Sequence, residues 1–145
     1  MKYMQGSDRK QTAIFPISMD IAIAEDNEVR IIDFFIDSLD IEEMGFSIDH
    51  GENGRPAYHP KDLLKLYLYG YLNSVRSSRK LEKETQRNIE VMWLLKGLSP
   101  DHNTISNFRR DNPKGIKKVF RSTVELAKNF DLIGGKLLAG DGTKL

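Results

Sequence analysis

The sequence contains no cysteine among its 145 residues. This absence excludes a disulfide framework and any metal centre with cysteine ligands in this chain. Long apolar runs are missing too: the densest one, LLKLYLYGYL, is short and includes Lys65, so it does not suit a bilayer span. The first residues, MKYMQGSDRKQT, lack the apolar segment of a signal peptide. The sequence therefore predicts a cytoplasmic protein without a membrane segment.

Net charge is nearly absent overall, at +1, but it is distributed unevenly along the chain. Residues 1–60 carry five basic and twelve acidic side chains, residues 61–121 carry fourteen and six, and residues 122–145 carry three of each. A central block with a net charge of +8 favours a surface that faces a polyanion. The alternative is that the acidic and basic blocks pack against each other and neutralise one another.

Histidine is scarce as well, with three residues, His50, His59 and His102, in separate segments. They lack the paired spacing of a zinc helix such as H-E-x-x-H, so a histidine metal site is not expected. His59 stands directly before Pro60 and is expected to help start a helix, and His102 is expected to help the turn before another.

Apolar residues recur at helical spacing from residue 26 onward, which predicts a mainly α, multi-helix bundle. We expect about six helices in one domain over residues 26–133, preceded by an irregular or extended segment over residues 1–25. The first helix has Asp26 as its expected N-cap and three aspartates opposite its apolar stripe. The stripe consists of Val29, Ile32, Phe35, Ile36 and Leu39, and the aspartates are Asp33, Asp37 and Asp40.

A second predicted helix begins at Pro60. An N–H at the first helical position has no partner within the helix, so proline, which lacks this N–H, is favoured there. This helix is apolar over most of its surface and is therefore expected at the centre of the bundle. A short polar helix capped by Ser77 or Ser78 follows, and then a more apolar helix with Gly97 as its C′ residue. The expected core comprises the tyrosine-bearing second helix together with Trp93, Leu94, Ile105, Phe108, Val119 and Phe120.

Residues 77–111 read as three short helices, the last with polar side chains at its exposed positions, which is typical of a helix-turn-helix segment that reads DNA. Arginine can bond a guanine edge twice, and asparagine can do the same to adenine. The expected DNA-binding residues are Arg79, Lys80, Lys83, Asn103, Thr104, Ser106, Asn107, Arg109 and Arg110. Nearby cations suited to phosphates are Arg76, Arg87, Lys114, Lys117, Lys118 and Arg121. The alternative is that these side chains form the solvated face of an ordinary helical bundle.

The stretch GKLLAGDGTKL differs from the rest of the chain. Its glycines disfavour a helix and its apolar residues favour a buried β-strand, which we expect over residues 134–145. A carboxylate on such a strand, Asp141, would be paired, hydrogen-bonded or bound to a cation. The alternative is a hairpin turn with Asp-Gly at its centre.

Four stretches, in this order, resemble the N-terminal part of insertion-sequence transposases of the DDE class: HPKDLLKLYLYGYL, SSRKLEKETQRNIEVMWLL, SPDHNTISNFRRDN and LLAGDGTKL. The resemblance covers about residues 26–145. It implies a helical DNA-binding domain that binds the terminal inverted repeats of the element, followed by the first strand of an RNase H-like catalytic core. It also implies that Asp141 is a catalytic residue and metal ligand, the first of three carboxylates that hold two Mg²⁺ or Mn²⁺ ions for cutting and joining DNA.

The other two carboxylates of this class have no counterpart in the sequence, and one carboxylate does not hold two ions. The resemblance therefore predicts a truncated transposase that binds DNA without cutting it. The unpaired strand edge predicts association into a homo-oligomer. Two other hypotheses are a freestanding helix-turn-helix regulator and a helical protein-interaction domain whose basic face meets an acidic protein.

Overall fold

Seven helices occur in the parts of the chain that the computed structural model describes, which are residues 3–10, 19–46 and 58–129. They are α1 (Met19–Ala22), α2 (Glu28–Asp37), α3 (Pro60–Leu72), α4 (Ser78–Arg87), α5 (Ile89–Leu94), α6 (His102–Asp111) and α7 (Pro113–Asn129). The predicted mainly α fold is confirmed. The additional helix, α1, lies in the segment that was predicted to be irregular, and the strand predicted over residues 134–145 lies outside the described residues.

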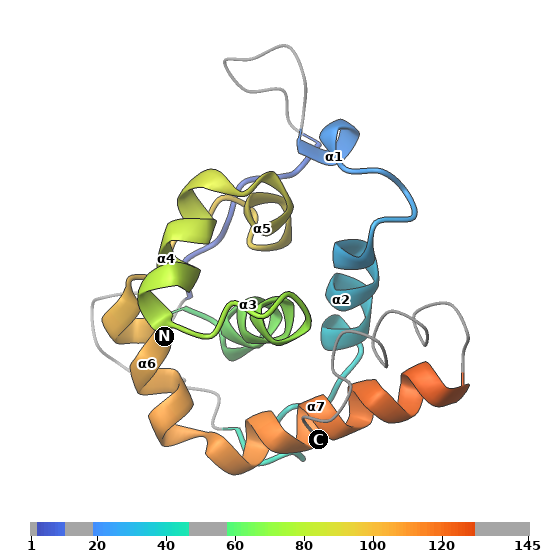
Figure 1. Ribbon diagram of the computed structural model, residues 1–145, viewed down its shortest axis with the longest axis vertical. Helices are drawn as coiled ribbons and strands as arrows, with labels where there is room; N and C mark the ends of the chain where they lie inside the picture. The colour runs from blue at the N-terminus through green and yellow to red at the C-terminus, as the bar shows by residue number, and fades with distance from the viewer. Residues whose placement is uncertain (1–2, 11–18, 47–57, 130–145) are drawn as a thin grey trace.

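The helix α3 runs through the middle of the bundle, and the other helices surround it (Figure 1). In this view α2 lies on one side, α4 and α6 on the other, α5 above and α7 below. Every residue of α3 from Leu63 to Gly70 is buried, as its nearly continuous apolar surface predicted. At Gly70 an added Cβ would collide with the carbonyl oxygen of Val75, so glycine permits the chain to fold back closely after α3.

Two helix starts follow the sequence prediction. Pro60 is the first residue of α3, and the Nδ1 atom of His59 accepts a hydrogen bond from the Lys61 N–H at 3.0 Å. Ser77 caps α4, with its hydroxyl oxygen accepting from the Lys80 N–H. Both caps pair donors that the first turn of a helix leaves without a partner.

The N-cap of α2 is Asn27, so the prediction of Asp26 was wrong by one residue. The Oδ1 atom of Asn27 accepts from the Val29 N–H at 2.9 Å, while its Nδ2 atom donates to Glu90 at 2.7 Å. An amide supplies both an acceptor for the cap and a donor for the carboxylate of α5, whereas an ionised aspartate supplies acceptors only. The cap therefore also ties α2 to α5.

The end of α5 differs from the prediction by one residue as well. Lys96, with a φ of 53°, holds the C′ position, and Gly97, with a φ of 82°, follows it. The Lys96 N–H donates to the carbonyl of Trp93 and the Gly97 N–H to that of Met92, which is the Schellman arrangement. The N-terminal segment lies against this turn, since the Ser7 N–H donates to the Lys96 carbonyl at 2.9 Å.

The core has the expected members, with one small difference. Trp93, Leu94, Ile105, Phe108 and Val119 are buried, while Phe120 is half-buried against the core. On α2 the residues Val29, Ile32 and Ile36 are buried and Phe35 is partly buried against the same core, as is Leu39 just after the helix.

The prediction that Asp33, Asp37 and Asp40 lie opposite the apolar stripe was wrong for Asp33, and α2 ends at Asp37, before Asp40. The Oδ1 atom of Asp33 lies 2.7 Å from Nζ of Lys65 and 2.8 Å from a guanidinium nitrogen of Arg9. The Lys65 side chain is 3% exposed and also pairs with Asp37 at 2.9 Å. A buried ammonium group requires paired acceptors, so α2 supplies two carboxylates one turn apart.

Candidate nucleic-acid interface

The helix α6 is held against the core by two buried side chains, Ile105 and Phe108. From α3, the Tyr67 hydroxyl donates a hydrogen bond to the Ile105 carbonyl at 2.5 Å, and the Tyr67 and Phe108 rings stack with their centroids 6.1 Å apart. Burial raises the pKa of Tyr67 to about 12, so the phenol remains a hydrogen-bond donor at neutral pH. These contacts fix the position and rotation of α6 on the central helix.

The first turn of α6 is held by two carboxylates. Asp101 is the N-cap, and its Oδ1 atom accepts from the Thr104 N–H at 2.7 Å; this hydrogen bond lowers the pKa of the Asp101 carboxyl. Glu82 of α4 accepts from the backbone N–H of His102 at 3.0 Å and lies 2.8 Å from the ring Nδ1 of the same residue. The bond from the His102 ring is the main cause that lowers the pKa of Glu82. Glu82 therefore joins α4 to the start of α6.

The outward face of α6 carries the predicted reading residues. Asn103, Ser106, Asn107 and Arg110 are all exposed, and their helical spacing places them opposite Ile105. Arg110 lies 3.0 Å from Asp111 in an ion pair whose two side chains are largely exposed, so this pair is weak and leaves the guanidinium accessible.

The neighbouring helix α4 buries Leu81 and Thr85 and exposes the predicted cations Arg79, Lys80 and Lys83. It packs closely against α6, as Figure 1 also shows. Of the nine predicted DNA-binding residues, Thr104 is half-buried and the others are exposed. We call the exposed group the α4/α6 face; it consists of Arg79, Lys80, Lys83, Asn103, Ser106, Asn107, Arg109 and Arg110. The structure thus brings the predicted residues together on two adjacent helices.

The connection between α5 and α6 comprises residues 95–101, whereas the turn of a helix-turn-helix has about three or four residues. In addition, α6 packs mainly against α4 and makes little contact with α5. The helix-turn-helix form of the segment therefore stays a prediction, while the pairing of α6 with α4 is the observed arrangement.

Ion pairs between the two charge blocks are few. Within the described residues, Lys65 is the one basic residue of the central block that pairs with acidic residues of the first 60, Asp33 and Asp37. The other ion pairs in this part of the chain join residues of the same block. The exposed cations of the central block are thus not neutralised by the acidic block there.

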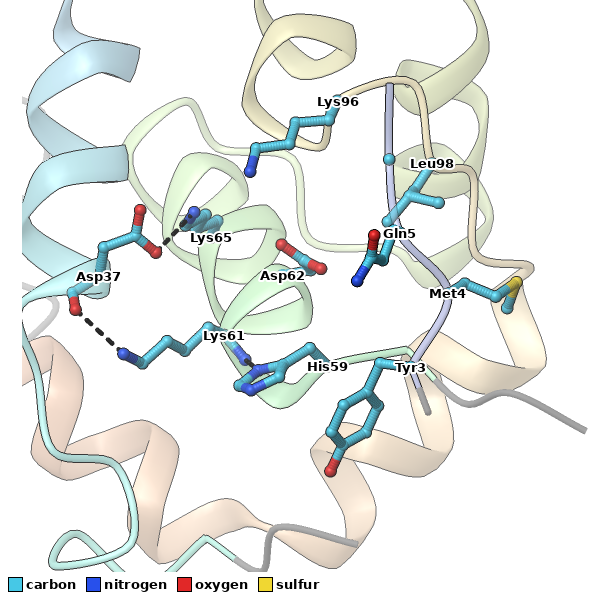
Figure 2. A pocket seen from close by; sticks show the side chains of 11 residues that line it. Tyr3, Met4, Gln5, Asp37, His59, Lys61, Asp62, Lys65, Lys96 and Leu98 are labelled. Carbon is cyan, nitrogen blue, oxygen red and sulfur yellow. Dashed lines mark hydrogen bonds and ion pairs between the residues drawn. The ribbon is translucent and has the colours of Figure 1, made fainter. Parts of the chain in front are cut away.

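A polar groove of about 490 Å³ lies elsewhere, where the N-terminal segment crosses the start of α3 (Figure 2). Burial raises the pKa of Asp62 and lowers the pKa of His59 in this groove. Two of the three lysines that line it are engaged, since Lys65 pairs with Asp37 and the Lys61 ammonium donates to the Asp37 carbonyl; Lys96 is the third. Sequence reasoning did not predict this groove, because residues 3–6 and the start of α3 are brought together only by the fold.

Asp141, the predicted catalytic and metal-binding residue, lies outside the described residues. Among the residues that are described, no group of three or more histidine, aspartate or glutamate side chains could hold a metal ion. In the same part of the chain, no helix is long and apolar enough to span a membrane.

The sequence did not predict that Tyr67 and Glu82 hold α6 in place. Glu82 could have been noticed as an acidic residue in a helix with four basic ones. Tyr67 could have been noticed because it lies on a buried helix, where its hydroxyl needs a hydrogen-bond partner. Neither signal identifies the partner, because each partner lies more than one helix away in the sequence.

A family model described as Transposase domain (DUF772) matches residues 17–111 of the chain. The matched range contains α1 to α6, and with them the whole α4/α6 face, while α7 follows it. Comparison with curated proteins and with solved structures gives no match.

Proposed function

Because the chain belongs to this transposase-domain family, we propose that it is the N-terminal part of an insertion-sequence transposase and binds the DNA ends of its element in the cytoplasm. The observation that carries the proposal is the α4/α6 face, where amides and guanidinium groups on α6 stand beside the cations of α4. Both helices lie within the residues that the family model matches.

In this proposal α6 is the helix that reads DNA bases. The major groove of B-DNA admits an α-helix, and asparagine and arginine side chains form paired hydrogen bonds with adenine and guanine. Asn103, Asn107 and Arg110 lie on the face that would enter the groove. Their positions are set by the two contacts that hold α6, from Tyr67 and from Glu82.

In the same proposal α4 binds the phosphate backbone. Lysine and arginine contacts to phosphates orient a protein on the duplex without reading its sequence. Arg79, Lys80 and Lys83 are exposed on the helix that packs next to α6, so they would meet the strand beside the groove. A helix-turn-helix mode of binding and the terminal inverted repeats as the target are parts of this proposal.

The second part of the proposal is that the transposase cuts and joins DNA. A DDE-type, RNase H-like core would hold Mg²⁺ or Mn²⁺ through three carboxylates, of which Asp141 would be one; the bound ions would activate the attacking oxygen. We also propose association into a homo-oligomer, which would bring two element ends together.

The salt dependence of binding tests the proposal directly. The chain is titrated against labelled duplexes from the two ends of its element, at salt concentrations between roughly 50 and 200 mM. Binding through phosphates predicts that log K falls linearly with log salt concentration, with a slope of about −0.9 for each phosphate contacted. Lys83→Gln should make the slope less steep by about one contact. No binding at the lowest salt concentration would contradict DNA binding by this chain.

A further inference from the structure

The solvent face of α7 carries four exposed cations that lie beyond the residues matched by the family model. These are Lys114, Lys117, Lys118 and Arg121, which we call the α7 stripe. Their spacings of three and four residues place them on one face of the helix. None of them forms an ion pair or a side-chain hydrogen bond with another residue in the described part of the chain.

The four positive charges of the α7 stripe repel one another. Lys114 stands three residues from Lys117 and four from Lys118, and Arg121 stands four residues from Lys117 and three from Lys118. Like charges at these spacings destabilise a helix. The first turn of α7 carries no acidic residue that would relieve the repulsion. An external polyanion would relieve it, so the stripe has a physical preference for such a partner.

The opposite face of α7 is packed firmly, so the stripe has a fixed place on the molecule. Ile116 and Val119 are buried, and the rings of Tyr71 and Phe120 have centroids 4.6 Å apart. At Gly115 an added Cβ would lie 2.7 Å from the Phe46 ring, so glycine allows α7 to approach that ring closely. The stripe is therefore presented by a helix that is held against the bundle through its opposite face.

The helices α6 and α7 meet at a corner. Asn112 ends α6 by donating its backbone N–H to the Phe108 carbonyl, and its own carbonyl accepts from the Ile116 N–H at 3.0 Å in the first turn of α7. Figure 1 shows that the two helices then run in different directions along the outer edge of the bundle. A duplex bound at α6 therefore needs additional length to reach the α7 stripe.

We propose that the α7 stripe is a second DNA-binding surface, which contacts phosphates of the duplex next to the segment bound by α6. This inference rests on the proposed DNA binding of the α4/α6 face. Residues 114–121 extend roughly 10 Å along the helix axis at about 1.5 Å per residue, which corresponds to about three base pairs. Lysine acts as a point charge towards phosphate, so the stripe adds affinity without sequence preference. We choose DNA over an acidic protein because α7 follows directly on α6, the helix that carries most of the α4/α6 face, so both surfaces are on consecutive helices.

The test compares two duplexes with the intact chain. The short duplex contains only the base pairs that the Lys117→Gln/Arg121→Gln variant protects in a footprint, and the long duplex has about ten more base pairs on each side. The variant Lys117→Gln/Arg121→Gln should weaken binding to the long duplex about tenfold and make its salt slope less steep by about 2. Its binding to the short duplex should change less than about twofold. The matched control, Lys117→Arg/Arg121→Lys, keeps both charges and should bind both duplexes as the parent chain does.

Every other outcome contradicts either the role of the α7 stripe or the proposed function. Equal losses on the two duplexes, or no loss on the long one, would overturn the role of the stripe while leaving the proposed function in place. Absence of binding by the parent chain to either duplex would overturn the proposed function and the inference together. If polyglutamate competes with the long duplex as well as unlabelled DNA does, the stripe is a surface for acidic proteins. Thermal unfolding should show the Gln variant to be at least as stable as the parent, because a like-charge pair has been removed.

Discussion

The hydroxyl of Tyr67 on the central helix donates a hydrogen bond to the main-chain carbonyl of Ile105 in the middle of α6. The same tyrosine stacks on Phe108, one turn further along α6. One buried side chain of α3 thus fixes both the depth and the rotation of the helix that presents Asn103, Asn107 and Arg110 to solvent. The contact connects the core of the bundle to its proposed DNA-binding face.

Tyr67→Phe removes this hydrogen bond and keeps the ring in place. The free energy of unfolding should fall by about 1 kcal/mol, the usual net contribution of such a bond. Urea unfolding followed by circular dichroism measures this change. An unchanged stability would mean that the bond contributes nothing to holding α6.

The same residue predicts a loss of stability at alkaline pH. The pKa of Tyr67 is raised by burial from about 10 to about 12, so the folded state favours the protonated phenol. Its contribution is therefore fully present below pH 10 and is lost as the pH rises towards 12. Unfolding curves between about pH 9 and 12 should show a steeper decline for the parent chain than for Tyr67→Phe. Parallel declines would contradict the assignment, although the buried Tyr69, whose pKa is also raised, adds a decline common to both.

Removal of the Asp33 carboxylate should lower the free energy of unfolding more than removal of the Lys65 ammonium group. Asp33→Ala deprives the buried Lys65 ammonium and the Arg9 guanidinium of a shared partner, and should cost about 3 kcal/mol. Lys65→Met fills a similar volume and leaves Asp33 paired with Arg9, so it should cost about 1 kcal/mol or less. Chemical unfolding of both variants checks the order, and the reverse order would show that the lysine, not the carboxylate, is the critical member.

Arg9 connects the N-terminal segment to α5. Its guanidinium bonds the Trp93 carbonyl at 2.6 Å and lies 4.1 Å from the centre of the Trp93 ring. Arg9→Ala should lower the free energy of unfolding by about 2 kcal/mol, since hydrogen bonds from charged groups are the stronger ones. Trp93 is the single tryptophan of the chain, so its fluorescence emission should shift to longer wavelength as water replaces the guanidinium. An unaltered emission spectrum would contradict this packing.

Glu82 should affect DNA binding without touching DNA. Glu82→Ala removes the acceptor that joins α4 to the His102 N–H, and is expected to weaken specific DNA binding several-fold. Glu82→Gln keeps an amide oxygen for the His102 N–H and should retain most of the affinity. Anisotropy titrations with an element-end duplex compare the two. If both variants bind as the parent chain does, Glu82 does not position α6.

Much of the fold could be predicted from the sequence because the signals are local. Pro60 and Ser77 begin helices through contacts within one turn, and the burial of Trp93 and Ile105 follows from their place on apolar stripes. The exposed face of α6 follows from helical periodicity alone. These features need no knowledge of what lies across the bundle.

The features that were not predicted depend on distant partners. Asn27 replaces Asp26 as a cap because its amide also reaches Glu90, which is 63 residues away. Asp33 turns inward because Arg9 and Lys65 converge on it from two other elements. For the candidate site, the exposed face of α6 was predictable, whereas the side chains that hold α6, Tyr67 and Glu82, were not.

The most direct test of the central claim, that the outward face of α6 reads DNA, is the ratio of dissociation constants for a scrambled duplex and an element-end duplex at one salt concentration. Asn107→Ala or Arg110→Ala should reduce this ratio about tenfold or more, since each paired base contact contributes about 1 to 3 kcal/mol of discrimination. Lys83→Gln on α4 should weaken binding to both duplexes equally and leave the ratio unchanged. A ratio that stays the same in the Asn107 and Arg110 variants would contradict the claim.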